Sequence, residues 1–302
     1  MMNDSNTLNV NETTSYLKAK RAQLFFIPLV VSIFVAAITL TIPNRFLSEA
    51  TLYPMIESNM PAGATLGGLA ALAGVNMRMN GGADKAALAL EILDSKEYIG
   101  RFIENHQIKV ELFAIEKWDA KRKEALIDPD IYDEKSKKWV RNVSEPYQIE
   151  PSIQEAVEKF KDSFKIASDK LSGTVKISFE SRSPDFSKKV LDLIIIDLNS
   201  YIRDIDVNDI AKNIVFLKEK VNSAESSELK VNLYKLLEEQ IKREMLTKNA
   251  ENYVFRVIDK PVSPELKNGP KRAIIVIVFY ILSLFLTILF FAVKGIKNNN
   301  AH

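Results

Sequence analysis

Hydrophobic residues are concentrated in two long uncharged runs, one toward each end of the chain. The first extends from Ala22 to Pro43 and the second from Ala273 to Val293, and neither contains a charged side chain. A helix needs about 20 apolar residues to cross the hydrocarbon core of a bilayer, which is the length of each run. Globular proteins rarely bury a helix of this length that is apolar on every face. The pattern therefore predicts two transmembrane helices, over residues 22–42 and 273–293.

The first run has one alternative explanation, a cleavable secretory signal. Its basic lead would suit a signal, but the run is longer than the roughly 7–15 residues of a signal's apolar region, and no small-x-small cleavage site follows it. We interpret the run as an uncleaved anchor. Lys18, Lys20 and Arg21 precede it, and basic flanks favour the cytoplasmic side of a membrane.

This orientation predicts cytoplasmic tails at residues 1–21 and 294–302 and an exported domain at residues 43–272. Lys267, Lys271 and Arg272 lie on the exported flank of the second run, where basic residues are unfavourable. A translocated domain of this length is little governed by such charges, so the predicted orientation stands.

Alternating stretches in the exported domain predict β-strands. The strongest one contains Val175, Ile177 and Phe179 in alternation with polar residues. Two more strands are expected near residues 47–53 and 253–259, and each adjoins one of the apolar runs. We expect these two strands to pair in a sheet close to the membrane. The predicted fold class is α+β, with a membrane-proximal α/β base.

Helical spacing dominates the rest of the domain. An amphipathic helix is expected over residues 83–106 with a break near Asp94, where Ser95 could cap the next helix, and Pro184 should open another helix. Residues 207–252 contain neither proline nor glycine, which predicts an extended helix of about 60 Å at about 1.5 Å per residue. The apolar residues that we expect on its subunit-contacting stripe are Leu217, Val221, Leu229 and Leu233. The highly charged stretch over residues 117–140, with both tryptophans, is expected to form a solvated helix and loops.

A search for catalytic and binding chemistry finds no site. The chain lacks a G-x-x-x-x-G-K-[ST] phosphate loop and a G-x-S-x-G nucleophile elbow. It contains no cysteine and only two histidines, of which His106 is expected at the surface. Its formal net charge is +2, without a patch suited to nucleic acid. We therefore predict a protein that is not an enzyme and that uses no metal or cofactor.

Four stretches of the sequence resemble the Wzz family of polysaccharide chain-length determinants, which are co-polymerases without a kinase domain. These stretches are PNRFLSEATLYP, LGGLAALAGV, ALALEILDSKEYIGRFI and VIDKPVSPELKNGPKRAIIVIV. The resemblance covers nearly the whole chain and is weaker between Trp118 and Tyr147. It implies a Gram-negative inner-membrane protein whose periplasmic domain forms a ring-like homo-oligomer, an octamer. It also implies that the protein acts with a Wzy-type polymerase on a lipid-linked glycan and sets the modal length of O-antigen.

Two groups of residues gain a candidate role from this resemblance. Pro261, Pro264 and Pro270 match the family's proline-rich segment over residues 261–270, which either helps to present the oligomer to the polymerase or simply joins a strand to a helix. The second group lies in a stretch rich in glycine, alanine and methionine. It either forms a mobile loop that faces the ring interior or a neighbouring subunit, or packs on the same subunit's sheet. Its members are Leu66, Leu69, Leu72 and Val75.

Two other functions remain possible from the sequence. The chain could regulate the length of another glycan, such as enterobacterial common antigen or capsule. It could also be an inner-membrane transport adaptor, a class in which we would expect a longer coiled-coil hairpin and a lipoyl-like β domain.

Overall fold

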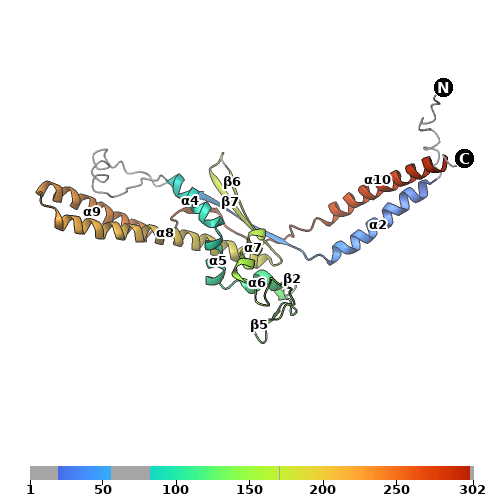
Figure 1. Ribbon diagram of the computed structural model, residues 1–302, viewed down its shortest axis with the longest axis horizontal. Helices are drawn as coiled ribbons and strands as arrows, with labels where there is room; N and C mark the ends of the chain where they lie inside the picture. The colour runs from blue at the N-terminus through green and yellow to red at the C-terminus, as the bar shows by residue number, and fades with distance from the viewer. Residues whose placement is uncertain (1–19, 56–81, 170, 300–302) are drawn as a thin grey trace, which may run out of the picture. The chain divides into compact units, whose positions relative to one another are not determined.

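The structure is a computed structural model that describes residues 20–55, 82–169 and 171–299, and it divides into two compact units (Figure 1). The first unit combines the chain up to Arg45 with the chain from Lys267 onward, and the second unit extends from Phe46 to Leu266. The predicted mobile-loop residues lie outside the described residues; they are Leu66, Leu69, Leu72 and Val75.

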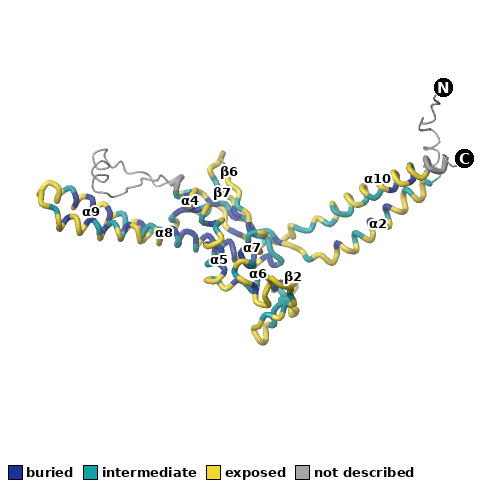
Figure 2. Tube along the Cα trace, viewed as in Figure 1, coloured by how far each residue is buried: buried dark blue, intermediate teal, exposed yellow. Residues whose placement is uncertain are grey.

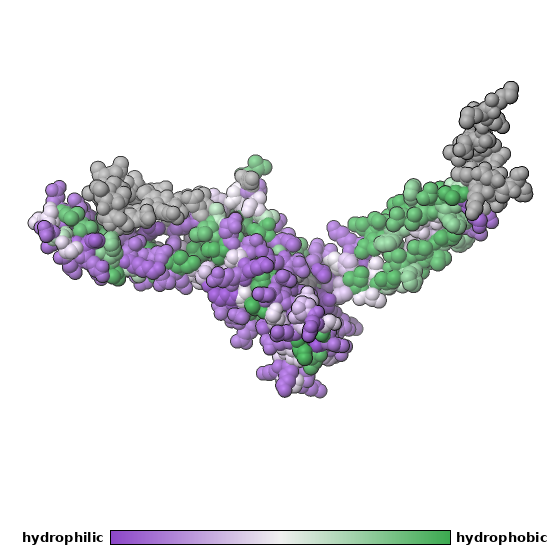
Figure 3. Space-filling model, in the orientation of Figure 1, coloured by the Kyte–Doolittle hydropathy of each residue, from purple (hydrophilic) through white to green (hydrophobic). Residues whose placement is uncertain are grey.

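The first unit is a pair of apolar helices, α2 (Arg21–Thr41) and α10 (Arg272–Asn299), which pack against each other. Both are long and apolar enough to cross a membrane, and only 17% and 11% of their apolar segments is buried. Figure 3 shows hydrophobic side chains over the visible surface of this pair. The buried hydroxyl groups of Ser32 and Thr287 donate hydrogen bonds to carbonyl oxygens four residues earlier in their own helices. These hydrogen bonds satisfy the hydroxyl groups within their own helices, as is needed in the hydrocarbon core of a membrane, where no water is available.

The second unit is built on a four-stranded antiparallel sheet with the order β6-β7-β1-β8. Its strands are β6 (Phe164–Asp169), β7 (Thr174–Ser181), β1 (Phe46–Pro54) and β8 (Phe255–Asp259). The predicted pairing of the first and last strands is confirmed, because Leu52 lies opposite Val257. Ala50 and Leu52 of β1 are buried and alternate with exposed Glu49 and Tyr53, so the sheet has one covered face (Figure 2).

Helices cover this buried face. They are α4 (Gly82–Asp94), α7 (Ile153–Ser163) and the first half of α8 (Pro184–Ser223), and α5 (Lys96–Asn105) packs on α7 and α4. Phe160 of α7 packs between Phe102 and Phe179, with ring centroids 5.8 and 5.2 Å away. Ser95 accepts a hydrogen bond from the Tyr98 backbone N–H, which confirms the predicted cap.

The charged stretch after α5 folds differently from the expectation. A short helix, α6 (Lys109–Ala114), leads into β2 (Ile115–Asp119) and β3 (Glu124–Ile127), and a second small hairpin joins β4 (Tyr132–Asp133) to β5 (Lys138–Trp139). The predicted solvated helix is therefore wrong. Charged residues mask the short alternation here, whereas cross-strand pairs such as Tyr132 opposite Trp139 favour hairpins.

The predicted single helix over residues 207–252 is also wrong, because the chain turns back within it. The 40-residue α8 ends at Ser223, and α9 (Ser227–Lys248) returns alongside it (Figure 1). Ala224 is in an extended conformation, with φ −72° and ψ 129°, and so breaks the helix. The fold class is confirmed: helices and strands are mixed, two apolar helices bound the domain, and α8 is the long helix.

Candidate functional site

The helical hairpin of α8 and α9 contains the residues that the sequence assigns to subunit contacts. The structure brings Leu217, Val221 and Leu233 together in a buried cluster between the two helices. Leu217 has an exposed fraction of 0%, whereas Leu229, near the turn, is 46% exposed. Three of the four residues therefore hold the hairpin together within one chain, and contact between copies stays a prediction.

A second apolar stripe lies on the outer side of α9. Val231, Tyr234, Ile241 and Met245 are 54%, 57%, 39% and 62% exposed. With Glu238 they recur at intervals of three, four, three and four residues, which is the spacing of a coiled-coil seam. No other helix in the described part of the chain covers this stripe, so α9 presents one seam to α8 and another to solvent.

The root of the hairpin is fixed to the sheet by Asn199 of α8. Its buried side-chain amide donates a hydrogen bond to the Phe255 carbonyl oxygen at 3.2 Å, and its Oδ1 accepts from the backbone N–H groups of Val254 and Phe255 at 2.8 and 3.0 Å. A buried polar side chain that is satisfied in this way specifies one arrangement of its neighbours. The returning chain therefore enters β8 at a defined position relative to α8.

A second polar contact lies close to this root. The Tyr253 hydroxyl group donates to Asp206 of α8 at 2.5 Å and accepts from Lys85 of α4 at 3.0 Å. Burial, and secondarily the hydrogen bond to Asp206, raises the pKa of the Tyr253 hydroxyl above its ordinary value. The phenol is thus kept neutral where it joins α4 to the hairpin.

The three prolines of the proline-rich segment belong to different units. Pro261 is buried and Pro264 half-buried in the α/β unit, where Ser48 donates to the Val262 carbonyl oxygen at 2.8 Å. Pro270 belongs to the helix-pair unit and lies next to a backbone bridge between Arg45 and Gly269. The segment over residues 261–270 therefore contains the boundary between the two units, and its predicted interaction with a polymerase stays a prediction.

A groove lies beside α7, in the region where the resemblance to known sequences is weakest. One wall is the exposed face of α7, with Glu155, Glu158, Lys159 and Asp162. The other wall is formed by Asp130, Ile131, Arg141, Asn142, Val143 and Tyr147. Phe113 of α6 and Arg182 also line the groove, whose volume is about 630 Å³. Tyr147 lies at the groove and is 53% exposed.

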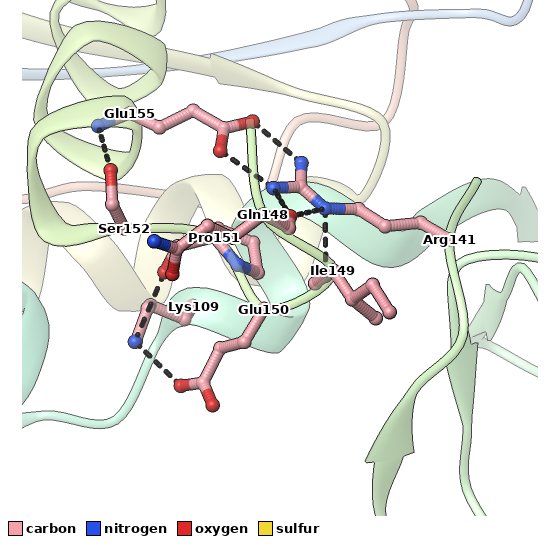
Figure 4. A network of polar contacts seen from close by, with 8 residues as sticks. All are labelled: Lys109, Arg141, Gln148, Ile149, Glu150, Pro151, Ser152 and Glu155. Carbon is pink, nitrogen blue, oxygen red and sulfur yellow. Dashed lines mark hydrogen bonds and ion pairs between the residues drawn. The ribbon is translucent and has the colours of Figure 1, made fainter. Parts of the chain in front are cut away.

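One ion pair holds the two walls of this groove together (Figure 4). Arg141 points at Glu155 and makes two hydrogen bonds to its carboxylate, at 2.5 and 2.6 Å. The same guanidinium group donates to the carbonyl oxygens of Gln148 and Ile149. Hydrogen bonding to Glu155 raises the pKa of Arg141, although burial opposes this. The bidentate pair fixes the 141–149 segment against the start of α7.

Catalytic chemistry is not evident in the part of the chain that the structure describes. No group of three or more His, Asp or Glu side chains there could hold a metal ion. His106 is half-buried: its ring contacts Phe102, and its Nε2 lies 3.4 Å from Asp197 Oδ1, while part of the side chain stays exposed. Asp133 accepts hydrogen bonds from the Ser136 hydroxyl and the Lys135 backbone N–H, which lower its pKa.

The chain is similar in structure to solved proteins, although sequence comparisons find no match. No model of a known protein family matches the chain, and no curated protein matches it. A solved structure described as a full-length bacterial polysaccharide co-polymerase is similar, with a TM-score of 0.36 and 12% identity. The match covers 98% of this chain and 100% of that one.

Proposed function

We propose that the chain is a polysaccharide co-polymerase of the Wzz type, a non-enzymatic regulator that sets the modal length of O-antigen together with a Wzy-type polymerase. The observation that carries the proposal is the architecture: two membrane-length apolar helices bound an α/β unit that carries a long helical hairpin. Three of the four stretches that resemble the Wzz family lie in described residues: one at β1, one across α4 and α5, and one from β8 into α10. The fourth, LGGLAALAGV, lies outside the described residues.

The location follows from the two apolar helices and the charges beside them. Both helices expose apolar side chains along most of their length, which a soluble protein could not tolerate without a partner. With a basic N-terminal flank inside, the α/β unit lies in the periplasm and both termini are cytoplasmic. The resemblance to the Wzz family supports a Gram-negative inner membrane as the location of this two-span protein.

Assembly into a homo-oligomer gives the outer seam of α9 a partner. Val231, Tyr234, Ile241 and Met245 match the spacing of a helix-packing seam and are uncovered in a single chain. A ring needs two different faces on each subunit, so this seam packs on another surface of the next copy rather than on itself. The resulting ring, an octamer by resemblance, presents several subunits to the polymerase.

The lipopolysaccharide ladder on a gel tests the function directly. Cells that lack the gene should lose the modal cluster of O-antigen lengths, and re-expression should restore it. An unaltered ladder contradicts the O-antigen assignment, and the ladders of enterobacterial common antigen and of capsule are then compared in the same way.

The outer seam is tested by a matched pair of variants. Ile241→Lys places a charge in the middle of the seam and should shift the protein in lipid nanodiscs or native membranes toward smaller species. Leu246→Lys is the control, because Leu246 is an equally apolar exposed residue of α9 outside the seam. If both variants assemble to the same extent, the outer seam of α9 does not form a contact between copies.

A transport adaptor is the second candidate function. The helical hairpin gives it support that the sequence analysis lacked. The antiparallel pair of α8 and α9 is a feature of such adaptors that the sequence did not predict. In the described residues, however, the largest sheet has four strands, one face of it covered by helices, and no lipoyl-like β domain is present. If all three glycan ladders are unaltered in the deletion strain, the adaptor becomes the leading hypothesis.

A further inference from the structure

The groove beside α7 has the size and the lining of a ligand site. Its volume of about 630 Å³ falls within the range of about 300–1,000 Å³ that is usual for small-molecule sites. The aromatic side chains Phe113 and Tyr147 and the apolar Ile131 and Val143 alternate with charged and amide groups along its walls. A lining of this mixed kind suits a ligand with both apolar faces and many polar groups.

Contacts within the protein fix the walls of the groove, so the groove is preorganised before any ligand binds. The Arg141–Glu155 pair joins them, and the Arg141 guanidinium group lies 5.4 Å from the centre of the Phe113 ring. Trp139 also makes an edge-to-face contact with that ring, with centroids 6.2 Å apart. Arg182 donates to the Ile115 carbonyl oxygen at 3.0 Å, which fixes a further part of the lining. Preorganised walls reduce the entropy that binding costs.

Several polar groups in the groove remain free for a ligand. Glu158 and Asp162 lie one helical turn apart on the exposed face of α7, and neither makes a hydrogen bond or an ion pair with the described residues. Asn142 faces them from the opposite wall of the groove. Carboxylates accept hydrogen bonds only, whereas an amide both donates and accepts. Vicinal hydroxyl groups and amino groups are the natural partners of this set.

The charge of the groove limits what it can accept. Because Arg141 and Glu155 neutralise each other, the remaining charges are three carboxylates, Asp130, Glu158 and Asp162, against two cations, Lys159 and Arg182. An acidic sugar would bring its carboxylate close to uncompensated negative charge, which is unfavourable. An amino group would instead gain an ion pair.

We propose that this groove binds a short stretch of glycan and prefers neutral or amino-bearing sugars to acidic ones, with the Tyr147 ring against a sugar face and Glu158 and Asp162 on its polar groups. This inference rests on the proposed function, because it takes the ligand to be the glycan whose length the protein regulates. It places a direct contact with the polymer on the α/β unit, separate from the hairpin.

The binding test uses the full-length protein in lipid nanodiscs, since many detergents carry sugar head groups. Three hexasaccharides of equal length serve as probes in calorimetry: a chitosan hexamer, an isomaltose-type hexamer and a galacturonate hexamer. The first two should bind, and the galacturonate hexamer should bind at least about tenfold more weakly. Binding of none of the three, or tightest binding of the acidic one, overturns the proposal.

Variants assign the binding to the groove. The double variant Glu158→Gln/Asp162→Asn should bind the chitosan hexamer about tenfold more weakly. The difference between its affinities for the chitosan and galacturonate hexamers should therefore be smaller than in the wild type. Tyr147→Ala should weaken binding of the amino and neutral hexamers, and Tyr147→Phe should restore it. The matched control Glu134→Gln/Glu219→Gln removes two exposed carboxylates elsewhere and should leave binding unchanged. Equal binding by the groove variant and the control variant overturns the assignment.

The glycan ladder separates failure of this inference from failure of the proposed function. If the deletion strain keeps its modal cluster, the proposed function itself is wrong. If the deletion removes the cluster while the groove variants support a normal ladder and bind the hexamers normally, only the groove inference is wrong. A ladder shifted by the groove variants but not by the control supports both.

Discussion

Shortening Leu217 at the centre of the hairpin should open the hairpin while the sheet stays folded. Leu217 is fully buried against Val221, Leu233 and Leu236, in a cluster separate from the main core. Leu217→Ala removes the transfer free energy of the lost methyl groups and leaves a cavity, and Leu→Ala changes in cores cost about 2.7–5 kcal/mol. We expect about 3 kcal/mol, near the lower end, because two helices joined by a short turn can partly close the gap.

Hydrogen exchange followed by mass spectrometry measures this loss where it occurs. A loss of about 3 kcal/mol should speed exchange of the amides in the hairpin by about 100-fold, since about 1.4 kcal/mol corresponds to a factor of ten. Amides of β1 and β7 should keep their protection, because they belong to the other cluster. The control Leu229→Ala, at a half-exposed position near the turn, should change exchange by less than tenfold.

Two results would refute the reasoning about the hairpin. Unchanged protection in Leu217→Ala would mean that α8 and α9 do not depend on this cluster. A loss of protection that depends on protein concentration, together with a shift to smaller species, would mean that Leu217 contacts a second copy. That is the role that the sequence analysis predicted for it.

Three further predictions concern single side chains. Gln240→Leu should stabilise the hairpin by about 1 kcal/mol in the same exchange assay, because the buried Gln240 Oε1 has no hydrogen-bond partner among the described residues; a loss of protection would contradict this. Arg141→Lys cannot reproduce the bidentate pair with Glu155, so the 141–149 segment should lose about 2 kcal/mol of local stability and be cleaved faster by protease, with exposed Arg122→Lys as the control. Burial and the nearby Asp197 raise the pKa of the Tyr98 hydroxyl above its ordinary value of 10.0, so folding favours its neutral form. The free energy of unfolding, measured with denaturant, should therefore fall as the pH rises above about 10, by up to about 1.4 kcal/mol per pH unit. Tyr98→Phe should flatten this pH dependence.

Much of the fold could be predicted because it depends on local patterns. The apolar runs, the alternation of Val175, Ile177 and Phe179, the cap at Ser95 and the helix start at Pro184 each reflect a rule that acts over a few residues. The two hairpins after α6 were missed because they have two to five residues per strand and are dense in charge. Their stability comes from packing such as Trp139 on Phe113, which no short window of sequence contains.

The candidate sites were predictable only in part. The sequence predicted one apolar stripe, which contains Leu217 and Leu233, for contacts between subunits. The turn at Ala224 instead brings α8 onto the Leu233 side of α9 and leaves Val231, Tyr234, Ile241 and Met245 exposed, a second stripe that the sequence analysis had not identified. The groove had no signal in the sequence at all, since Phe113, Tyr147, Glu158 and Arg182 come from segments far apart along the chain.

The sequence by itself determined the two membrane-length helices, the α+β class and the lack of any recognised catalytic motif, because length, periodicity and composition are local properties. Only the tertiary structure decided that the long helical region folds back on itself, which of its stripes is covered, and that a groove forms beside α7. These features depend on which segments, distant in sequence, pack on the same apolar surface. The arrangement with the lowest free energy for the whole chain decides this, and no short stretch of sequence contains that information.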